Sequence, residues 1–191
     1  MKLFLVTIIT ALLMTVGTAA AQNINFGIKG GLNSYNINTD PDSDTDSKIG
    51  LNVGLLGHIH LTDQYAFQPE LVYSMQGATS GNTDLKLNYI NVPLLVQYMF
   101  DNGFRIQAGP QLGYLLNAES ENNNSSNDLT DNFKSIDMGL SLGASYVHPP
   151  TGFGVDARYN FGLTNISDSS NLDTTNRGFQ VGVFYLFSHR N

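Results

Sequence analysis

Apolar and polar residues alternate along most of this chain with a period of two, which is the pattern of β-strands. The clearest example is the stretch 179–187, whose unbroken apolar stripe consists of Phe179, Val181, Val183, Tyr185 and Phe187. A stripe with aromatic rings at both ends suits a membrane-spanning β-barrel, because the stripe contacts lipid and the rings lie at the two interfaces. The closing strand of a soluble sandwich or lipocalin would alternate in the same way, so this strand alone does not decide between them.

The same alternation recurs in seven earlier segments, and it predicts an all-β fold, an eight-stranded antiparallel up-and-down transmembrane β-barrel. The expected strands are 24–37, 48–61, 65–76, 85–100, 104–117, 136–146, 153–164 and 179–187. Leu85 and Leu87 are out of phase with the apolar positions that follow from Ile90, which predicts a β-bulge near Tyr89. None of these segments has the periodicity of a helix.

The connections between the expected strands alternate in length. Short turns are expected at 62–64, 101–103 and 148–152, and longer polar loops at 38–47, 79–84, 120–132 and 167–175. Outer-membrane barrels have short turns on the periplasmic rim and long loops on the extracellular rim. The alternation therefore predicts a cell outer membrane location, and the even number of strands places both chain termini on the periplasmic rim.

The distribution of charge separates a membrane barrel from a soluble cup. A soluble cup keeps its apolar face inside, around a ligand, and its charged face in water. Here one face of nearly every strand has no charge, whereas the opposite face carries Lys29, Glu70, Arg105, Asp137, Asp156 and Arg158. Three cations and three anions suit a narrow lumen, where unpaired charges would be strongly penalised. We therefore predict lipid outside and a filled, ion-paired polar lumen without a wide pore.

The N-terminus and the composition narrow the class further. Residues 1–21 have the features of a cleavable signal peptide, with Lys2, an apolar run over 3–16 and small residues at 19–21. This run is too short to span a bilayer, which argues against a membrane-anchoring helix. The expected mature domain after cleavage is 22–191. Loss of Lys2 changes the formal charge from −7 to −8, which makes nucleic acid an unsuitable partner. The absence of cysteine excludes a disulfide framework and a lipid-modified N-terminal cysteine.

The remaining charges gather at the expected outer rim. Acidic residues lie in or beside the four long loops, at Asp40, Asp42, Asp44, Asp46, Asp84, Glu119, Glu121, Asp128, Asp131, Asp168 and Asp173. One cation stands where the chain returns to a strand after each loop: Lys48, Lys86, Lys134 and Arg177. These cations could contact phosphates of an anionic outer-leaflet glycolipid such as lipopolysaccharide, or simply extend to the interface as lysine and arginine commonly do.

Five ordered blocks resemble a known family. They are 26–33 (FGIKGGLN), 67–74 (FQPELVYS), 87–95 (LNYINVPLL), 109–116 (GPQLGYLL) and 156–166 (DARYNFGLTNI). Together they resemble the PorT-like outer-membrane β-barrel family across the whole mature chain. The resemblance implies an eight-stranded outer-membrane barrel and a link to a protein-secretion apparatus, the second of which belongs to one family member.

Candidate chemistry is sparse, and we predict no catalytic residue, metal or cofactor. Asp42, Asp44 and Asp46 begin like a calcium loop, but Ser47 and Val53 occupy the places of the glycine and glutamate that an EF-hand requires. His58 and His60 share one strand face and could ligate a metal or serve a lipid-modifying enzyme. No third ligand is evident nearby, so polar lumen residues are the simpler interpretation.

The sequence therefore favours a non-catalytic structural or interaction protein of the cell envelope, acting through acidic extracellular loops. The alternatives are an accessory of protein secretion or surface assembly, a lipid-modifying barrel enzyme and a narrow pore. Expected partners are outer-membrane lipid, the barrel-assembly machinery during biogenesis and an envelope or secretion protein.

Overall fold

The computed structural model describes residues 24–40, 46–81, 83–122, 125–167 and 173–187. The expected signal peptide, residues 1–21, lies outside these ranges. Within the described ranges, no helix is long and apolar enough to cross a membrane.

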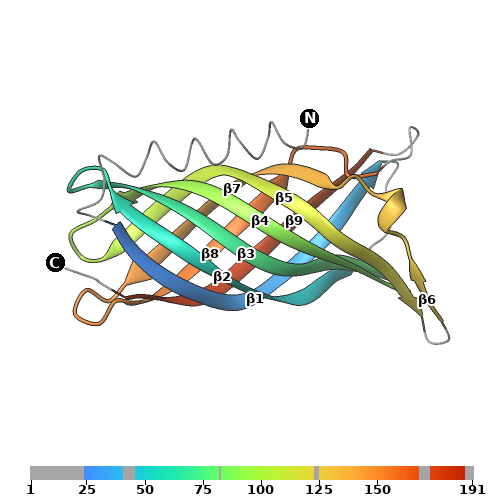
Figure 1. The fold of residues 1–191 in the computed structure, drawn as a ribbon, viewed down its shortest axis with the longest axis horizontal. Coiled ribbons are helices and arrows are strands. Elements are labelled where there is room, and N and C mark those ends of the chain that lie inside the picture. Colours follow the sequence, from blue (N-terminus) through green and yellow to red (C-terminus); the bar gives the residue numbers. More distant parts are fainter. Residues whose placement is uncertain (1–23, 41–45, 82, 123–124, 168–172, 188–191) are drawn as a thin grey trace.

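Eight antiparallel strands close into an up-and-down barrel, as the alternation predicts (Figure 1). The barrel strands are β1 (Ile24–Asp40), β2 (Asp46–His60), β3 (Tyr65–Ser80), β4 (Thr83–Met99), β5 (Phe104–Asn122), β7 (Ile136–Val147), β8 (Phe153–Gly162) and β9 (Asp173–Leu186). Each barrel strand pairs with the next one along the chain, and β1 pairs with β9 to close the ring. A ninth strand, β6 (Ser125–Asp128), pairs with the outer end of β5 and is followed by the short 3-10 helix η1 (Thr130–Asn132).

The two faces of the strands differ as the sequence predicts. On β2, Leu55 faces outward and its residue is 58% exposed, whereas the neighbouring Leu56 faces the lumen and is 3% exposed. Alternate residues of a strand point to opposite faces, so the other strands repeat this contrast. The predicted bulge is also confirmed, because the β4–β5 register shifts between Asn88 and Tyr89. The outer wall of the barrel is therefore an apolar surface, and the lumen holds most of the polar side chains.

The strands extend further into all four outer connections than predicted, and two of the connections differ most. Residues 79–84 are not a long loop, because β3 and β4 continue to Ser80 and Thr83 and turn around Gly81, which has a positive φ of 56°. Likewise β5 continues to Asn122 and forms a hairpin with β6. The polar composition of these segments hid their alternation. Their inward positions include buried Ala78, Leu87 and Ala118, and this burial stabilises the longer strands. The β5–β6 hairpin projects at the end of the barrel opposite the short turns (Figure 1).

Two apolar clusters lie inside the barrel, one near each end. The outer cluster consists of Ile37, Ala78, Leu87, Tyr89, Leu115, Ala118 and Ile166, with Leu85, Leu129 and Phe133 packed against it. The periplasmic cluster consists of Leu56, Val147, Phe184 and Leu186. Both clusters place apolar side chains in the lumen, and polar side chains lie between them.

Glycines opposite two aromatic rings allow the lumen to pack closely. Phe184 is the cross-strand partner of Gly154, and a Cβ on Gly154 would lie 2.2 Å from the ring atom Cζ. Tyr35 is opposite Gly178 in the same way, with 2.5 Å between such a Cβ and ring atom Cγ. An aromatic ring thus covers a glycine on the neighbouring strand, which is a known way of stabilising a glycine in a sheet.

Candidate functional site

Four charged side chains meet in the middle of the lumen. Lys29 of β1 lies 3.2 Å from the Glu70 carboxylate of β3 and 3.3 Å from the Asp156 carboxylate of β8, measured from Nζ. Arg158 of β8 donates Nη1 and Nη2 to the two oxygens of Glu70, both at 2.9 Å, and Nε to Asp156 at 3.1 Å. Each carboxylate is therefore shared by two cations, and the cluster of four is electrically neutral.

The four charged side chains of this cluster are almost completely buried. The four side chains have relative exposures between 0% and 2%. In such an environment charges are tolerated only when they are paired and hydrogen-bonded. The two-pronged contact between Arg158 and Glu70 also fixes the orientation of both groups. The cluster therefore ties together β1, β3 and β8 across the interior.

A relay of amide groups extends the cluster toward β5. Gln68 donates to Glu70 at 2.8 Å, and Gln97 donates to Gln68 at 3.1 Å and to Gln107 at 2.7 Å. These glutamines were absent from the sequence-based candidates. The sequence could have identified them, because glutamine occurs at the same face of three neighbouring strands and a polar side chain does not face lipid.

The six predicted lumen charges are not all brought together. Arg105 is 3% exposed, and the buried Nη1 of its side chain has no hydrogen-bond partner among the described residues. Asp137 accepts a 2.8 Å hydrogen bond from Thr164, near the outer end of the barrel. The strand register separates the two residues. Arg105 is opposite Ser145 of β7, and Asp137 lies eight residues before Ser145 on β7, which is a separation of roughly 26 Å along the strand. The expectation that these two residues would be ion-paired was wrong for the described structure.

The four rim cations divide into two pairs. Lys48 donates to Asp84, and Lys86 donates to Glu121, so both lysines already have carboxylate partners. The hydrogen bond from Lys48 lowers the pKa of Asp84, and the hydrogen bond to Glu121 raises the pKa of Lys86. Both groups lie on the outer part of β4, beyond the apolar band.

Lys134 and Arg177 lie on another part of the rim. Both residues are exposed, and the backbone N–H of Lys134 donates to the Ile166 carbonyl at 2.8 Å. Arg177 belongs to the outward-facing positions of β9 and is opposite Phe161 of β8. These two residues lie near the outer ends of β7 and β9.

The histidine pair lies inside the periplasmic half of the barrel. The rings of His58 and His60 meet edge to face with centroids 4.6 Å apart, and His58 is fully buried. No group of three metal-ligating residues occurs among the residues placed by the structure. Of the predicted acidic motif, Asp42 and Asp44 lie outside the described residues, and Asp46 is exposed at the start of β2.

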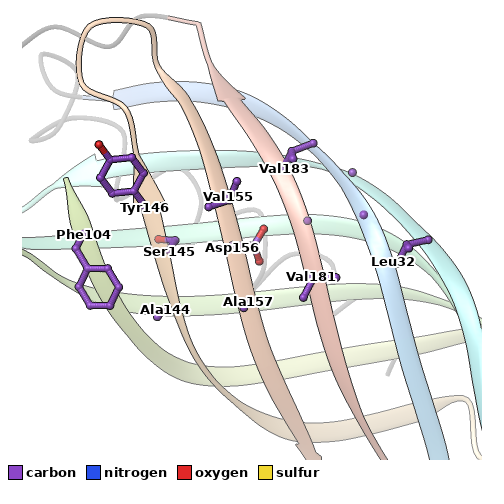
Figure 2. A pocket seen from close by; sticks show the side chains of 13 residues that line it. Leu32, Phe104, Ala144, Ser145, Tyr146, Val155, Asp156, Ala157, Val181 and Val183 are labelled. Carbon is purple, nitrogen blue, oxygen red and sulfur yellow. The ribbon is translucent and has the colours of Figure 1, made fainter.

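A shallow apolar groove of about 660 Å³ crosses the outer wall (Figure 2). Small residues at outward positions, including Gly30, Ala144 and Ala157, form part of it, and larger side chains such as Tyr146 and Val183 border it. It belongs to the surface that contacts membrane hydrocarbon.

A closed barrel with an apolar wall, a charge-paired lumen and a polar outer rim defines a transmembrane β-barrel of the outer membrane. Residues 20–168 match the family described as outer membrane protein beta-barrel domain, and the chain belongs to this family. No curated protein sequence matches it.

Solved structures of outer-membrane barrels share the fold. Neisserial surface protein A is 16% identical, with a TM-score of 0.61 and coverage of 85% of this chain and 97% of that one. Ail, the attachment invasion locus protein of Yersinia pestis, is 15% identical, with a TM-score of 0.54 and coverage of 87% and 100%. At these identities the likeness shows the fold alone. With the family match, it places the protein in the cell outer membrane as an envelope barrel protein.

Proposed function

We propose that this barrel is a non-catalytic structural and interaction component of the cell envelope, which acts through its outer hairpins and rim. The observation that carries the proposal is the filled lumen. Apolar clusters occupy both ends, and the neutral cluster of four charges lies between them. Since buried side chains occupy the lumen at these levels, the outer rim and the lipid-facing wall are the surfaces that we propose for contacts.

The outer hairpins favour a partner with positive charge. Glu119, Glu121 and Asp128 lie on the β5–β6 hairpin, and Asp131 lies in η1 directly after it. These carboxylates, of which Glu121 is already paired with Lys86, attract a basic partner at long range, and salt screens this attraction. The hydrogen bonds from Thr130 lower the pKa of Asp128, so that this carboxylate stays ionised in mildly acidic surroundings.

Outer-membrane lipid is the second proposed partner. Lys134 and Arg177 have the position and the charge to contact headgroup phosphates, such as those of lipopolysaccharide. Lys48 and Lys86 would first have to share or release their carboxylates. The barrel-assembly machinery is a further proposed partner during biogenesis.

The other functions have weaker support. A lipid-modifying enzyme needs its catalytic groups at the membrane edge, whereas His58 is fully buried in the lumen. A narrow pore conflicts with the two apolar clusters. A role as a secretion accessory rests on the resemblance of the five sequence blocks to the PorT-like family.

The proposal is tested by crosslinking intact cells that carry either the native barrel or a variant in which a short Gly-Ser turn replaces residues 119–132. The native barrel should capture a partner, and the variant should lose it while retaining heat-modifiable migration on a detergent gel. A matched variant with Glu119→Gln, Glu121→Gln and Asp128→Asn should weaken capture if charge recognises the partner. Absence of a hairpin-dependent partner, together with an intact envelope after gene deletion, would contradict the proposal.

A further inference from the structure

Arg105 differs from the other arginine of the lumen in having no partner. Arg158 donates to two carboxylates, whereas the buried Nη1 of Arg105 has no hydrogen-bond acceptor within the described structure. Its cross-strand neighbour on β7 is Ser145, whose buried hydroxyl also has no partner. Directly opposed side chains on one sheet face are about 5 Å apart at Cβ. Two buried polar groups without partners therefore lie on neighbouring inward positions.

The amide relay supplies a third group to this volume. Glu70 can only accept, so Gln68 must present its Nε2 to Glu70 and its Oε1 to Gln97. Gln97 also donates its Nε2 to Oε1 of Gln107. The Nε2 of Gln107 is left without an acceptor. Gln107 is two residues from Arg105 on the same face of β5. The carboxylate thus sets the orientation of the relay, and the relay ends in a donor beside Arg105.

The charge of this layer is unbalanced. Asp156 of β8 is opposite Ser145, but Lys29 and Arg158 already compensate Asp156 and Glu70, so Arg105 adds one further positive charge to this layer. The unpartnered oxygen of Asp156 does not serve Arg105, because it points to β9, 3.2 Å from where a Cβ on Gly182 would lie. A buried guanidinium without a counter-charge is strongly disfavoured. A negatively charged acceptor beside Arg105 would remove this cost, whereas the unpartnered Oε1 of Gln97, which is opposite Gln107, is uncharged.

We propose that a small monovalent anion of the halide class binds in the lumen between β5 and β7, held by the Arg105 guanidinium, the Gln107 amide N–H group and the Ser145 hydroxyl. Three buried donors without acceptors occupy neighbouring inward positions there, which favours an anion over a cation. Val147 of the periplasmic apolar cluster is two residues from Ser145 on β7, and Asp156 of the four-charge cluster is opposite Ser145 on β8, so side chains of both clusters border the site. The anion is a structural component of the lumen, and it completes the charge balance that the side chains leave open.

Bromide provides the test, because it replaces chloride and scatters anomalously. Crystals of the mature native barrel grown in sodium bromide should show an anomalous peak in contact with Arg105 and Ser145. Arg105→Gln should abolish the peak, whereas Arg177→Gln, a change of the same type on the outer rim, should retain it. A lumen that contains water alone at this place would overturn the proposal. A peak that persists in Arg105→Gln would identify an adventitious ion and would overturn it equally.

Stability gives an independent measurement in solution. At constant ionic strength, replacing gluconate by chloride from 10 to 100 mM should raise the folded-to-unfolded ratio of the native barrel by up to about tenfold. Gln107→Glu should remove this dependence, because its carboxylate supplies the negative charge beside Arg105. This variant keeps the arginine and can accept from Gln97, so it remains informative if Arg105→Gln does not fold. A chloride response equal in native barrel and Gln107→Glu would refute the site.

Discussion

Removing Arg158 tests whether the lumen is dry and charge-paired. In Arg158→Gln, Glu70 and Asp156 would share the single cation Lys29, which leaves one uncompensated negative charge among side chains that are at most 2% exposed. Breaking a buried ion pair by removing one partner typically destabilises a protein by about 3–5 kcal/mol. We expect the free energy of unfolding to fall by about that amount.

The matched change is the double variant Glu70→Gln with Arg158→Gln. It removes one charge of each sign and leaves Lys29 paired with Asp156, so the remaining cluster is neutral. Its loss of stability should be smaller than the sum of the two single losses by about 1–3 kcal/mol, which is the usual range for residues in direct contact. Lys86→Gln, which breaks an exposed pair on the rim, should leave the unfolding midpoint unchanged.

Urea-dependent folding in lipid vesicles, followed by the heat-modifiable gel band, measures these free energies. The linear dependence on urea gives the stability of each variant, and equal slopes confirm that the same surface is exposed. A cost below about 1 kcal/mol for Arg158→Gln would show that water screens these charges, as in an open channel. That result would refute the enclosed lumen.

Three further predictions follow from the packing, the rim and the plugs. Gly154→Ala should destabilise the barrel by about 1–3 kcal/mol in the same urea assay because its Cβ would overlap Phe184, whereas Gly57→Ala, whose Cβ would have ordinary contacts at 3.7 Å, should not. Because the Lys48 hydrogen bond lowers the pKa of Asp84, the stability from this pair should be present above the ordinary carboxyl pKa and lost as pH falls through the lowered one. An NMR titration should show an Asp84 midpoint that rises in Lys48→Gln, and an unchanged midpoint would contradict this. Planar-bilayer recordings of the native barrel should show no conductance steps, and stepwise currents would contradict the apolar plugs.

The barrel was predictable because the alternation of apolar and polar residues is local. Leu55 and Leu56 are chemically identical neighbours with opposite environments, and only their phase within the strand distinguishes them. The bulge near Tyr89 was predictable for the same reason, since a change of phase is visible in the sequence. The lengths of the outer hairpins were not, because the polar and small residues around 79–84 alternate weakly.

The pairing of the lumen charges could not be read from the sequence. Lys29, Glu70 and Arg158 come from strands that are distant along the chain, and the stagger of the strands around the barrel decides which of their side chains share a level. The same stagger separates Arg105 from Asp137, although both were correctly assigned to the inward face. The sequence thus identified the inward-facing charged residues, but it did not show which of them form ion pairs.

Quenching of single tryptophans by brominated lipids tests the central claim, the outward orientation of the charge-free face, most directly. The chain contains no tryptophan, so each substitution reports alone. Leu55→Trp should be strongly quenched by bromine in the lipid acyl chains, because this position faces outward, whereas Leu56→Trp, one residue further, should be protected inside the barrel. Quenching of Leu56→Trp with protection of Leu55→Trp, or equal quenching of both, would contradict an apolar wall in hydrocarbon around a charge-paired lumen.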